Sequence, residues 1–174
     1  MTMQTKKVTL TFKRKELLYD IKNNCYIDAE APQNRPDGDM NEAHDRHQVQ
    51  AVGDDGNVDR VTRVLDLTFA ECVELCFPYT KAEVVEDISH DDTMHESDYV
   101  MVMNVSEGFS QTTVNLLVKS IHELMVDKVV ADWMSINKPD SFANWQTKAE
   151  AAAQSVVSML NARTRPVRRK MRPF

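Results

Sequence analysis

The sequence of 174 residues is poor in the residue types that define several classes of protein. Only four Gly and six Pro exclude collagen-like and linker-rich architectures. Three Cys, a small and odd number, favour reduced thiols over a disulfide scaffold. No apolar run reaches the roughly 18 to 20 residues of a membrane span, and the N-terminal stretch MTMQTKKVTLTFKRK lacks the apolar core of a secretory signal. The sequence therefore predicts neither a membrane protein nor a secreted one.

Charged residues, in contrast, are abundant and unevenly distributed. A net charge of −6 results from 21 Lys and Arg against 27 Asp and Glu. Residues 28–98 hold 19 acidic and five basic side chains, whereas residues 1–15 hold five basic side chains and no acidic one. The last twelve residues, RTRPVRRKMRPF, hold six basic side chains and no acidic one. Such blocks are often interaction tails, and the alternative is a solvated tail that only keeps the protein soluble.

The N-terminal third is predicted to combine a β-ribbon with a long loop. Apolar and polar residues alternate over 7–12, which predicts a half-buried strand. Residues 16–21 are predicted to form a second strand and residues 25–27 a further extended piece, which together give an N-terminal β-hairpin. Residues 28–57 contain three of the four Gly and several turn signals, so they predict a long acidic loop. A loop of this length is usually functional or mobile.

Helical periodicity dominates the rest of the chain. Apolar residues recur at spacings of three and four over 58–77, 110–136 and 141–162, and each pattern predicts an amphipathic helix. Residues 80–87 are compatible with a short helical turn. The apolar run over 99–105 fits either a buried strand or a buried helix, because the pattern does not separate the two at this length.

The fold class that follows is α+β and mainly helical. An apolar content of 42% is sufficient for a core, and at about 100 to 200 residues per domain the length predicts one domain with an appendage. Three aromatic side chains are predicted to form the core of the bundle: Trp133, Phe142 and Trp145. The predicted organisation is a single domain over 1–162, made of a β-rich segment over 1–27, the acidic loop over 28–57 and a helical bundle over 58–162, followed by an extended basic arm over 163–174.

Possible metal ligands form only weak patterns. His44 and His47 lie in one polar acidic stretch, and His90 and His95 lie in another. Imidazole and carboxylate groups are competent metal ligands, but an HxxH spacing outside a known scaffold is a weak signal. We therefore predict no metal and no cofactor.

Possible catalytic groups are similarly isolated. Cys72 and Cys76 lie one turn apart on the apolar stripe of a predicted helix, so we expect buried thiols rather than reactive ones. His122 and Glu123 lie one turn before Asp127, but no nucleophile, phosphate-binding loop or known catalytic motif accompanies them. The sequence therefore predicts no catalytic residue and a protein that is not an enzyme.

The basic arm over 163–174 admits two interpretations. Its six basic side chains suffice to neutralise several phosphates of a nucleic acid. However, the rest of the chain is strongly acidic, and no aromatic residue is interleaved with the basic ones apart from Phe174. A protein partner fits better, with Phe174 in an apolar pocket and the basic groups bonded to carboxylates. The residues predicted to dock are Arg163, Arg165, Arg168, Arg169, Lys170, Arg172 and Phe174.

The C-terminal third also resembles a known family. The stretch LLVKSIHELMVDKVVADWMSINKPDSFANWQTKAEAAAQSVVSMLNARTRPVRRKMRPF is similar to structural proteins of tailed-phage and prophage morphogenesis clusters. In these a long helix ends in an Ala-Asp-Trp box, here Ala131 to Trp133, and an Ala-rich helix carries an Asn-Trp pair, here Asn144 and Trp145. The layout resembles that of head–tail connector subunits, also called adaptor or neck-ring subunits. The strand and the acidic loop at the N-terminus depart from the minimal, all-helical adaptor.

The resemblance implies a virion structural protein. Connector subunits form rings, often of twelve copies, which join the portal to the tail and line a channel through which genomic DNA passes without sequence specificity. Their C-terminal arms dock onto the portal or an adjoining subunit, and they reside in the neck or tail region of virions assembled in the host cytoplasm. The alternatives are a tail terminator or completion protein, a small nucleic-acid-binding regulator that uses the basic arm, and a metal-dependent enzyme.

Overall fold

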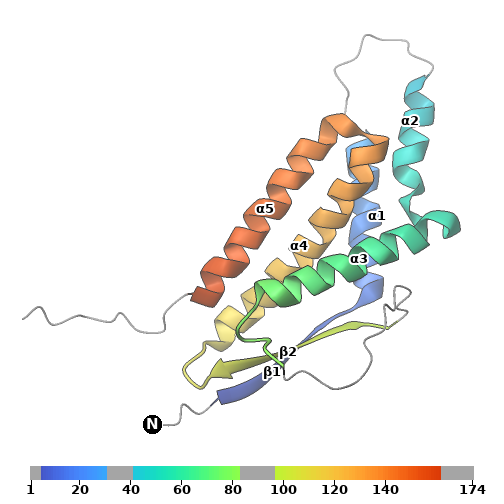
Figure 1. Cartoon of the computed structure of the whole chain (residues 1–174). Coiled ribbons are helices and arrows are strands. Elements are labelled where there is room, and N and C mark those ends of the chain that lie inside the picture. Colours follow the sequence, from blue (N-terminus) through green and yellow to red (C-terminus); the bar gives the residue numbers. More distant parts are fainter. Residues whose placement is uncertain (1–4, 31–40, 83–96, 162–174) are drawn as a thin grey trace, which may run out of the picture.

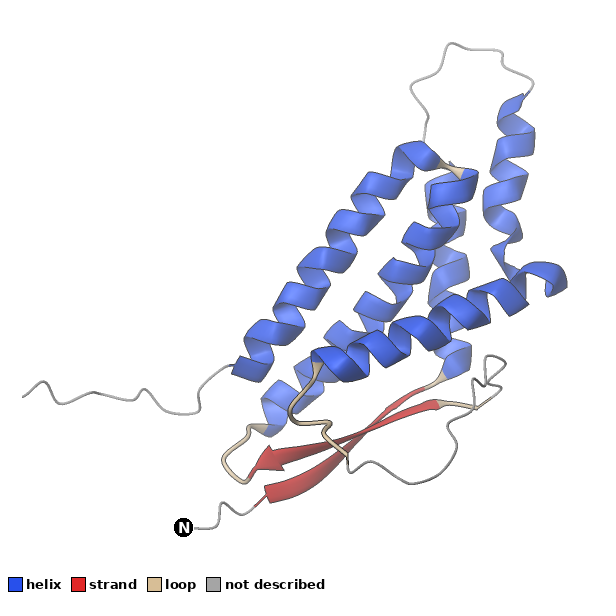
Figure 2. Ribbon diagram, in the orientation of Figure 1, coloured by secondary structure: helices blue, strands red, loops and turns tan. Residues whose placement is uncertain are grey.

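The computed structural model describes residues 5–30, 41–82 and 97–161, and the side chains of residues 41–45 are not described. Helices predominate and two strands form one sheet, so the prediction of a mainly helical α+β fold is confirmed (Figures 1 and 2). In chain order the elements are β1 (Thr5–Phe12), α1 (Arg14–Glu30), α2 (Asn41–Gln50), the 3-10 turn η1 (Ala51–Gly53), α3 (Asp55–Leu75), β2 (Tyr99–Ser106), α4 (Gln111–Asn137) and α5 (Pro139–Asn161).

The β-ribbon joins distant parts of the sequence rather than neighbouring ones. Strand β1 pairs antiparallel with β2, in a register that runs from Thr5 opposite Ser106 to Phe12 opposite Tyr99. The prediction of a hairpin with residues 16–21 was wrong, because these residues and residues 25–27 belong to α1. The buried residues of α1 recur every four positions and face the core, which is a helical period: Leu17, Ile21, Cys25 and Ala29.

The described residues of the predicted loop over 28–57 are helical, apart from Asp54, so the prediction of a loop is wrong for them. Residues 28–30 end α1, residues 41–53 form α2 and η1, and residues 31–40 lie outside the described part of the chain. Val49 and Val52 are buried, and the indole Nε1 of Trp133 donates a hydrogen bond to the backbone oxygen of Val49 at 3.0 Å. The composition of this segment favours turns, but α2 packs against α1 and α4. Such tertiary contacts can override the local preference and stabilise a helix.

The three predicted helices are confirmed as α3, α4 and α5, with ends that differ from the predictions by a few residues. The apolar run over 99–105, which the sequence left open, is a strand, and its alternate residues are buried from Tyr99 to Val105. The predicted helical turn over 80–87 lies mostly outside the described residues. No helix of the described part is long and apolar enough to cross a membrane.

Helix α4 is the centre of the core. It contacts α5, α3, α1, α2 and β1, and its buried residues occupy several faces, as a central helix requires. Trp133 and Trp145 are buried, but Phe142 is 38% exposed, so the prediction that it belongs to the bundle core is corrected. Phe142 lies in the first turn of α5, at the end of the α4–α5 hairpin, where fewer neighbouring elements cover a side chain.

Candidate functional site

A partly buried polar junction ties α1 to the turn between α4 and α5. Asp28 lies near the end of α1, and the ammonium of Lys138 donates hydrogen bonds to its Oδ1 and to its backbone oxygen, both at 2.6 Å. Ser141 Oγ donates to Oδ1 at 2.8 Å, and Trp145 Nε1 donates to Oδ2 at 2.7 Å. The side chains of Asp28 and Lys138 are only 15% and 11% exposed. Both carboxylate oxygens are thus satisfied in a site that is largely closed to water.

The electrostatics of this junction favour the charged carboxylate. Burial by itself raises the pKa of Asp28, but the hydrogen bonds from Lys138, Trp145 and Ser141 outweigh burial and lower the pKa below its ordinary value. A carboxylate held in this way is ionised at neutral pH, and its three hydrogen bonds make it a weaker base than a free carboxylate. The junction therefore holds three helices in place and is a poor general base.

Three large apolar side chains that flank this junction are exposed. Ile27 precedes Asp28, Phe142 follows Ser141, and Ile136 lies two residues before Lys138. Their exposed fractions are 58% for Ile27, 38% for Phe142 and 56% for Ile136. We call these three residues the junction surface. They lie at the same end of the α4–α5 hairpin, and apolar side chains that gather into one patch are typical of a protein interface.

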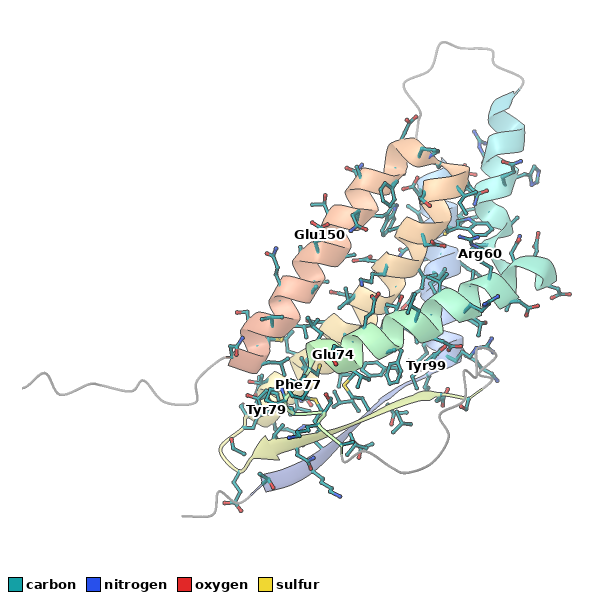
Figure 3. All side chains as sticks on the ribbon, viewed as in Figure 1. Arg60, Glu74, Phe77, Tyr79, Tyr99 and Glu150 are labelled. Atoms are coloured by element: carbon teal, nitrogen blue, oxygen red, sulfur yellow. The ribbon has the colours of Figure 1, made fainter. Side chains whose placement is uncertain are left out.

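The opposite end of the α4–α5 hairpin has a comparable surface. The Tyr79 hydroxyl donates a hydrogen bond to the backbone oxygen of Leu160 at 3.0 Å, which ties the segment after α3 to the end of α5. Figure 3 shows Phe77 and Tyr79 near each other beyond the end of α3. The exposed apolar side chains of this end are those of Phe77 (55%), Leu116 (53%) and Val157 (38%), which we call the Tyr79 surface.

The two surfaces are well separated. Leu116 and Ile136 lie twenty residues apart on α4, which corresponds to about 30 Å along the helix axis. Because α4 is a single helix packed along α5, the distance between the two surfaces is set by one rigid unit (Figure 1).

A second polar cluster links the ribbon to the helices. The Tyr99 hydroxyl donates to Asp66 Oδ1 at 2.5 Å, and Arg14 Nη2 donates to Thr62 Oγ1 at 2.6 Å. Burial, and then the bond to Asp66, raise the pKa of Tyr99 above its ordinary value. The phenol therefore stays protonated, and this cluster fixes the start of α1 and β2 against α3.

The side chains that the sequence identified as possible catalytic groups have the following partners and pKa values. His122 Nε2 lies 2.8 Å from Oδ2 of Asp20, a partner on α1 that sequence spacing did not indicate. Cys72 and Cys76 are buried, and burial raises their pKa values to about 12 and about 11, so both are protonated thiols at neutral pH. Burial also raises the pKa of Asp127, to about 6.

Only some of the histidines that were weighed as possible metal ligands belong to the described residues. His90 and His95 lie outside the described residues, and the side chain of His44 is not described. Among the side chains that are described, no group of three or more His, Cys, Asp or Glu is arranged to hold a metal ion.

A groove of about 400 Å³ lies between α1 and the segment that joins α2 to α3. The side chain of Lys22 runs over Gly53 so closely that a Cβ at residue 53 would lie 2.0 Å from the Lys22 Cε. The contacting atoms are the far end of a flexible side chain, so a larger residue at position 53 would displace the Lys22 ammonium rather than the two segments. The lining residues are Tyr19, Lys22, Asn23, Tyr26, Gln50, Gly53 and Asp54.

The predicted docking arm, residues 163–174, lies outside the described part of the chain, so its role stays a prediction. Comparison of the chain with protein-family models, with curated proteins and with solved structures found no significant match. The resemblance to connector subunits therefore rests on the residues quoted above, and the junction and Tyr79 surfaces are the structural features on which a function can be argued.

Proposed function

We propose that this chain is a non-enzymatic structural subunit that assembles into a ring, as a head–tail connector subunit of a tailed phage does. The observation that carries the proposal is that large apolar side chains are exposed at both ends of the α4–α5 hairpin. Each surface presents three large apolar side chains, which is unfavourable in water and favourable against a neighbour.

Two different surfaces on one rigid subunit favour a particular kind of assembly. When one surface of a copy binds a different surface of the next copy, the contact is heterologous, and it closes into a ring if the rotation per copy allows. The Asp28 junction and the Tyr79 bond fix both ends of the hairpin to the rest of the domain. The angle between the two surfaces is therefore nearly constant, which a closed ring requires.

The distribution of charge is consistent with the same role. Residues 28–98 are strongly acidic and residues 163–174 are strongly basic. In the proposed ring, the basic arm of each subunit docks onto the portal or onto the acidic surface of a neighbour. An acidic lining would repel the phosphates of passing DNA and so keep it from binding to the channel wall.

The test uses two matched substitutions on α4. Ile136→Asp places a charge in the junction surface, and Leu116→Asp places one in the Tyr79 surface; the two positions are 56% and 53% exposed. Each variant alone should be unable to extend an assembly, whereas a mixture should give a 1:1 complex, because each partner supplies the surface that the other lacks. Light scattering and native mass spectrometry measure the outcome, in the presence of a portal ring if the free subunit does not assemble.

A control and a contradicting result complete this experiment. Ala151→Asp places the same charge at an exposed position in the middle of α5, away from both surfaces, and should leave the assembly unchanged. If either variant assembles like the unmodified protein, or if the mixture forms no complex, the head-to-tail arrangement is wrong.

The arm is tested separately. Removal of residues 163–174 should leave the helical circular dichroism spectrum nearly unchanged and abolish binding to the portal. If the shortened chain still joins its portal partner normally, the docking role of the arm is wrong. Binding of the full chain to duplex DNA at physiological ionic strength, lost with rising salt, would instead favour the nucleic-acid-binding alternative.

A further inference from the structure

One edge of the β-ribbon is open, and the structure shows which residues form it. The amide of Asn104 donates a hydrogen bond to the backbone oxygen of Tyr79 at 2.7 Å, so it points away from β1. Lys7, which lies opposite Asn104, therefore belongs to a pair without mutual hydrogen bonds. Because such pairs alternate with hydrogen-bonded ones in an antiparallel ladder, every second residue of β1 directs its N–H and C=O groups outward. These residues are Thr5, Lys7, Thr9 and Thr11.

Nothing in the described residues pairs with these outward groups. The sheet contains only β1 and β2, and none of the described backbone hydrogen bonds outside the helices and the ladder involves residues 5–12. The ribbon of β1 and β2 lies at one end of the molecule, below α3 in the view of Figure 1. The side chains of all four outward residues are exposed. An eight-residue edge strand without proline is a template for pairing with another strand.

We propose that this edge pairs with β1 of a second copy of the chain, antiparallel and around a two-fold axis. The two ribbons then form one four-stranded sheet. In the register we assign, Thr5 lies opposite Thr11 of the second copy and Lys7 lies opposite Thr9 of the second copy. Val8 lies on the two-fold axis, opposite its own equivalent. All four outward residues of each strand are then hydrogen-bonded.

The sequence of β1 selects this register over its neighbours. A shift of two residues in one direction places Lys7 directly opposite Lys7 of the second copy, which like-charge repulsion disfavours. A shift of two residues in the other direction leaves Thr5 without a partner. In the assigned register the two Lys7 side chains are diagonal neighbours, so screening of their repulsion should make the dimer tighter as ionic strength rises.

The side chains near the joint also fit a continuous sheet. Val8 is only partly buried within one copy, and its equivalent on the axis would cover it further. On the other face, Thr9 and Thr11 lie opposite the exposed Val102 and Val100, so a β-branched surface would run across all four strands.

This pairing goes beyond the proposed ring. It uses neither the junction surface nor the Tyr79 surface, and it joins two copies through identical surfaces, whereas the ring joins different ones. A two-fold dimer would thus be a contact separate from the ring, and the 1:1 complex of the two ring variants is expected in the Thr9→Pro background described below, in which this contact is weakened. Substitutions in β1 test the dimer without altering the surfaces on which the ring proposal depends.

The first experiment is disulfide trapping in the full chain. Cα atoms opposite each other in a non-hydrogen-bonded pair are about 4.5 Å apart, which is within disulfide range. Val8→Cys should therefore give a covalent dimer under mild oxidation. Thr9→Cys is the matched control: in the assigned register its two copies are offset by two residues, about 7 Å along the strand and more in total, so they should not bridge. The native cysteines are buried and should not interfere: Cys25, Cys72 and Cys76.

The second experiment removes one outward hydrogen bond. Thr9→Pro deletes an N–H that points away from β2, so the β1–β2 ladder keeps its bonds, whereas Thr9→Val retains the N–H and the β-branched shape. The unmodified protein and Thr9→Val should be dimers by analytical ultracentrifugation, and Thr9→Pro should weaken dimerisation at least tenfold with its helical spectrum intact.

Several results would overturn the proposal. They are a monomeric unmodified chain at all concentrations, an unchanged dimer in Thr9→Pro, or disulfide formation that is as fast in Thr9→Cys as in Val8→Cys. If Thr9→Pro does not fold, the comparison of the two cysteine variants decides the matter. The failure of the ring proposal would appear differently, as a normal assembly of Ile136→Asp or Leu116→Asp in the presence of the portal.

Discussion

Replacement of Asp28 by Asn is the most direct test of the junction that holds α1 against the α4–α5 turn. The two side chains have nearly the same shape, but Asn is neutral and offers one acceptor oxygen and one donor nitrogen. Asp28 accepts bonds from Lys138, Ser141 and Trp145. In the Asp28→Asn variant the new amide nitrogen would therefore face a donor whichever way the amide is turned, and Lys138 would lose its counter-charge.

The expected loss of stability can be worked out from the burial of the pair. Hydrogen bonds to charged groups contribute about 1.5 to 3 kcal/mol, and breaking a buried ion pair costs about 3 to 5 kcal/mol. Asp28 and Lys138 are 15% and 11% exposed, and Asn retains one acceptor, so we expect a loss of about 3 kcal/mol. Asp132, whose carboxylate lies 2.9 Å from Arg60 Nη2, has a similar partner but is 36% exposed, so Asp132→Asn should cost less than about 1 kcal/mol.

Urea unfolding at pH 7, followed by circular dichroism, measures both variants against the unmodified protein. If the free energy of unfolding falls with urea concentration at a similar slope in all three proteins, the substitutions change stability and not the compactness of the denatured state. If Asp28→Asn and Asp132→Asn differ by less than about 0.5 kcal/mol, burial does not strengthen the junction and the reasoning is refuted.

The pH dependence gives an independent check of the Asp28 junction. The pKa of Asp28 is lower in the folded protein than its ordinary value, so its contribution is fully present above the ordinary pKa of about 4. The contribution is lost as the pH falls through the folded pKa. The difference in stability between the unmodified protein and Asp28→Asn should therefore be constant from pH 8 to about pH 5 and shrink below about pH 4.

Three further predictions concern the core. Burial raises the pKa of Asp127 to about 6, so the stability linked to its protonation is present below about pH 4 and lost as the pH rises through 6. Asp127→Asn removes this ionisation. In urea titrations it should therefore raise the free energy of unfolding by on the order of 2 kcal/mol at pH 8 and leave it unchanged at pH 4. Trp133→Phe removes the buried bond to the backbone oxygen of Val49 and should lower the free energy of unfolding by about 2 kcal/mol, with an unchanged spectrum. Burial raises the thiol pKa values to about 11 or 12, so a thiol reagent at pH 8 should modify no cysteine until urea unfolds the chain; fast modification of the folded protein would contradict the burial of Cys25, Cys72 and Cys76.

The sites were less predictable from the sequence than the helices. The members of the polar junction are far apart in the chain, since Asp28 is 110 residues from Lys138 and 117 from Trp145, and no spacing rule connects them. Asp20, the partner of His122, is 102 residues away from it. Phe142 was expected in the core because it continues an apolar stripe, but the stripe does not show that the end of a hairpin is less covered than its middle.

The sequence by itself determined the three long helices of the C-terminal two thirds, the mainly helical class and the uneven charge. It did so because a helix is closed by bonds between residues four apart, and its buried face repeats every three or four residues, as in Leu117, Ile121 and Leu124. Only the tertiary structure decided the partner of β1, the helical state of residues 16–21 and the surfaces at the two ends of the hairpin. A strand is completed by bonds to a partner that can lie anywhere in the chain, and Thr5 lies opposite Ser106. Burial likewise depends on which elements are neighbours in space, and that is a property of the folded chain.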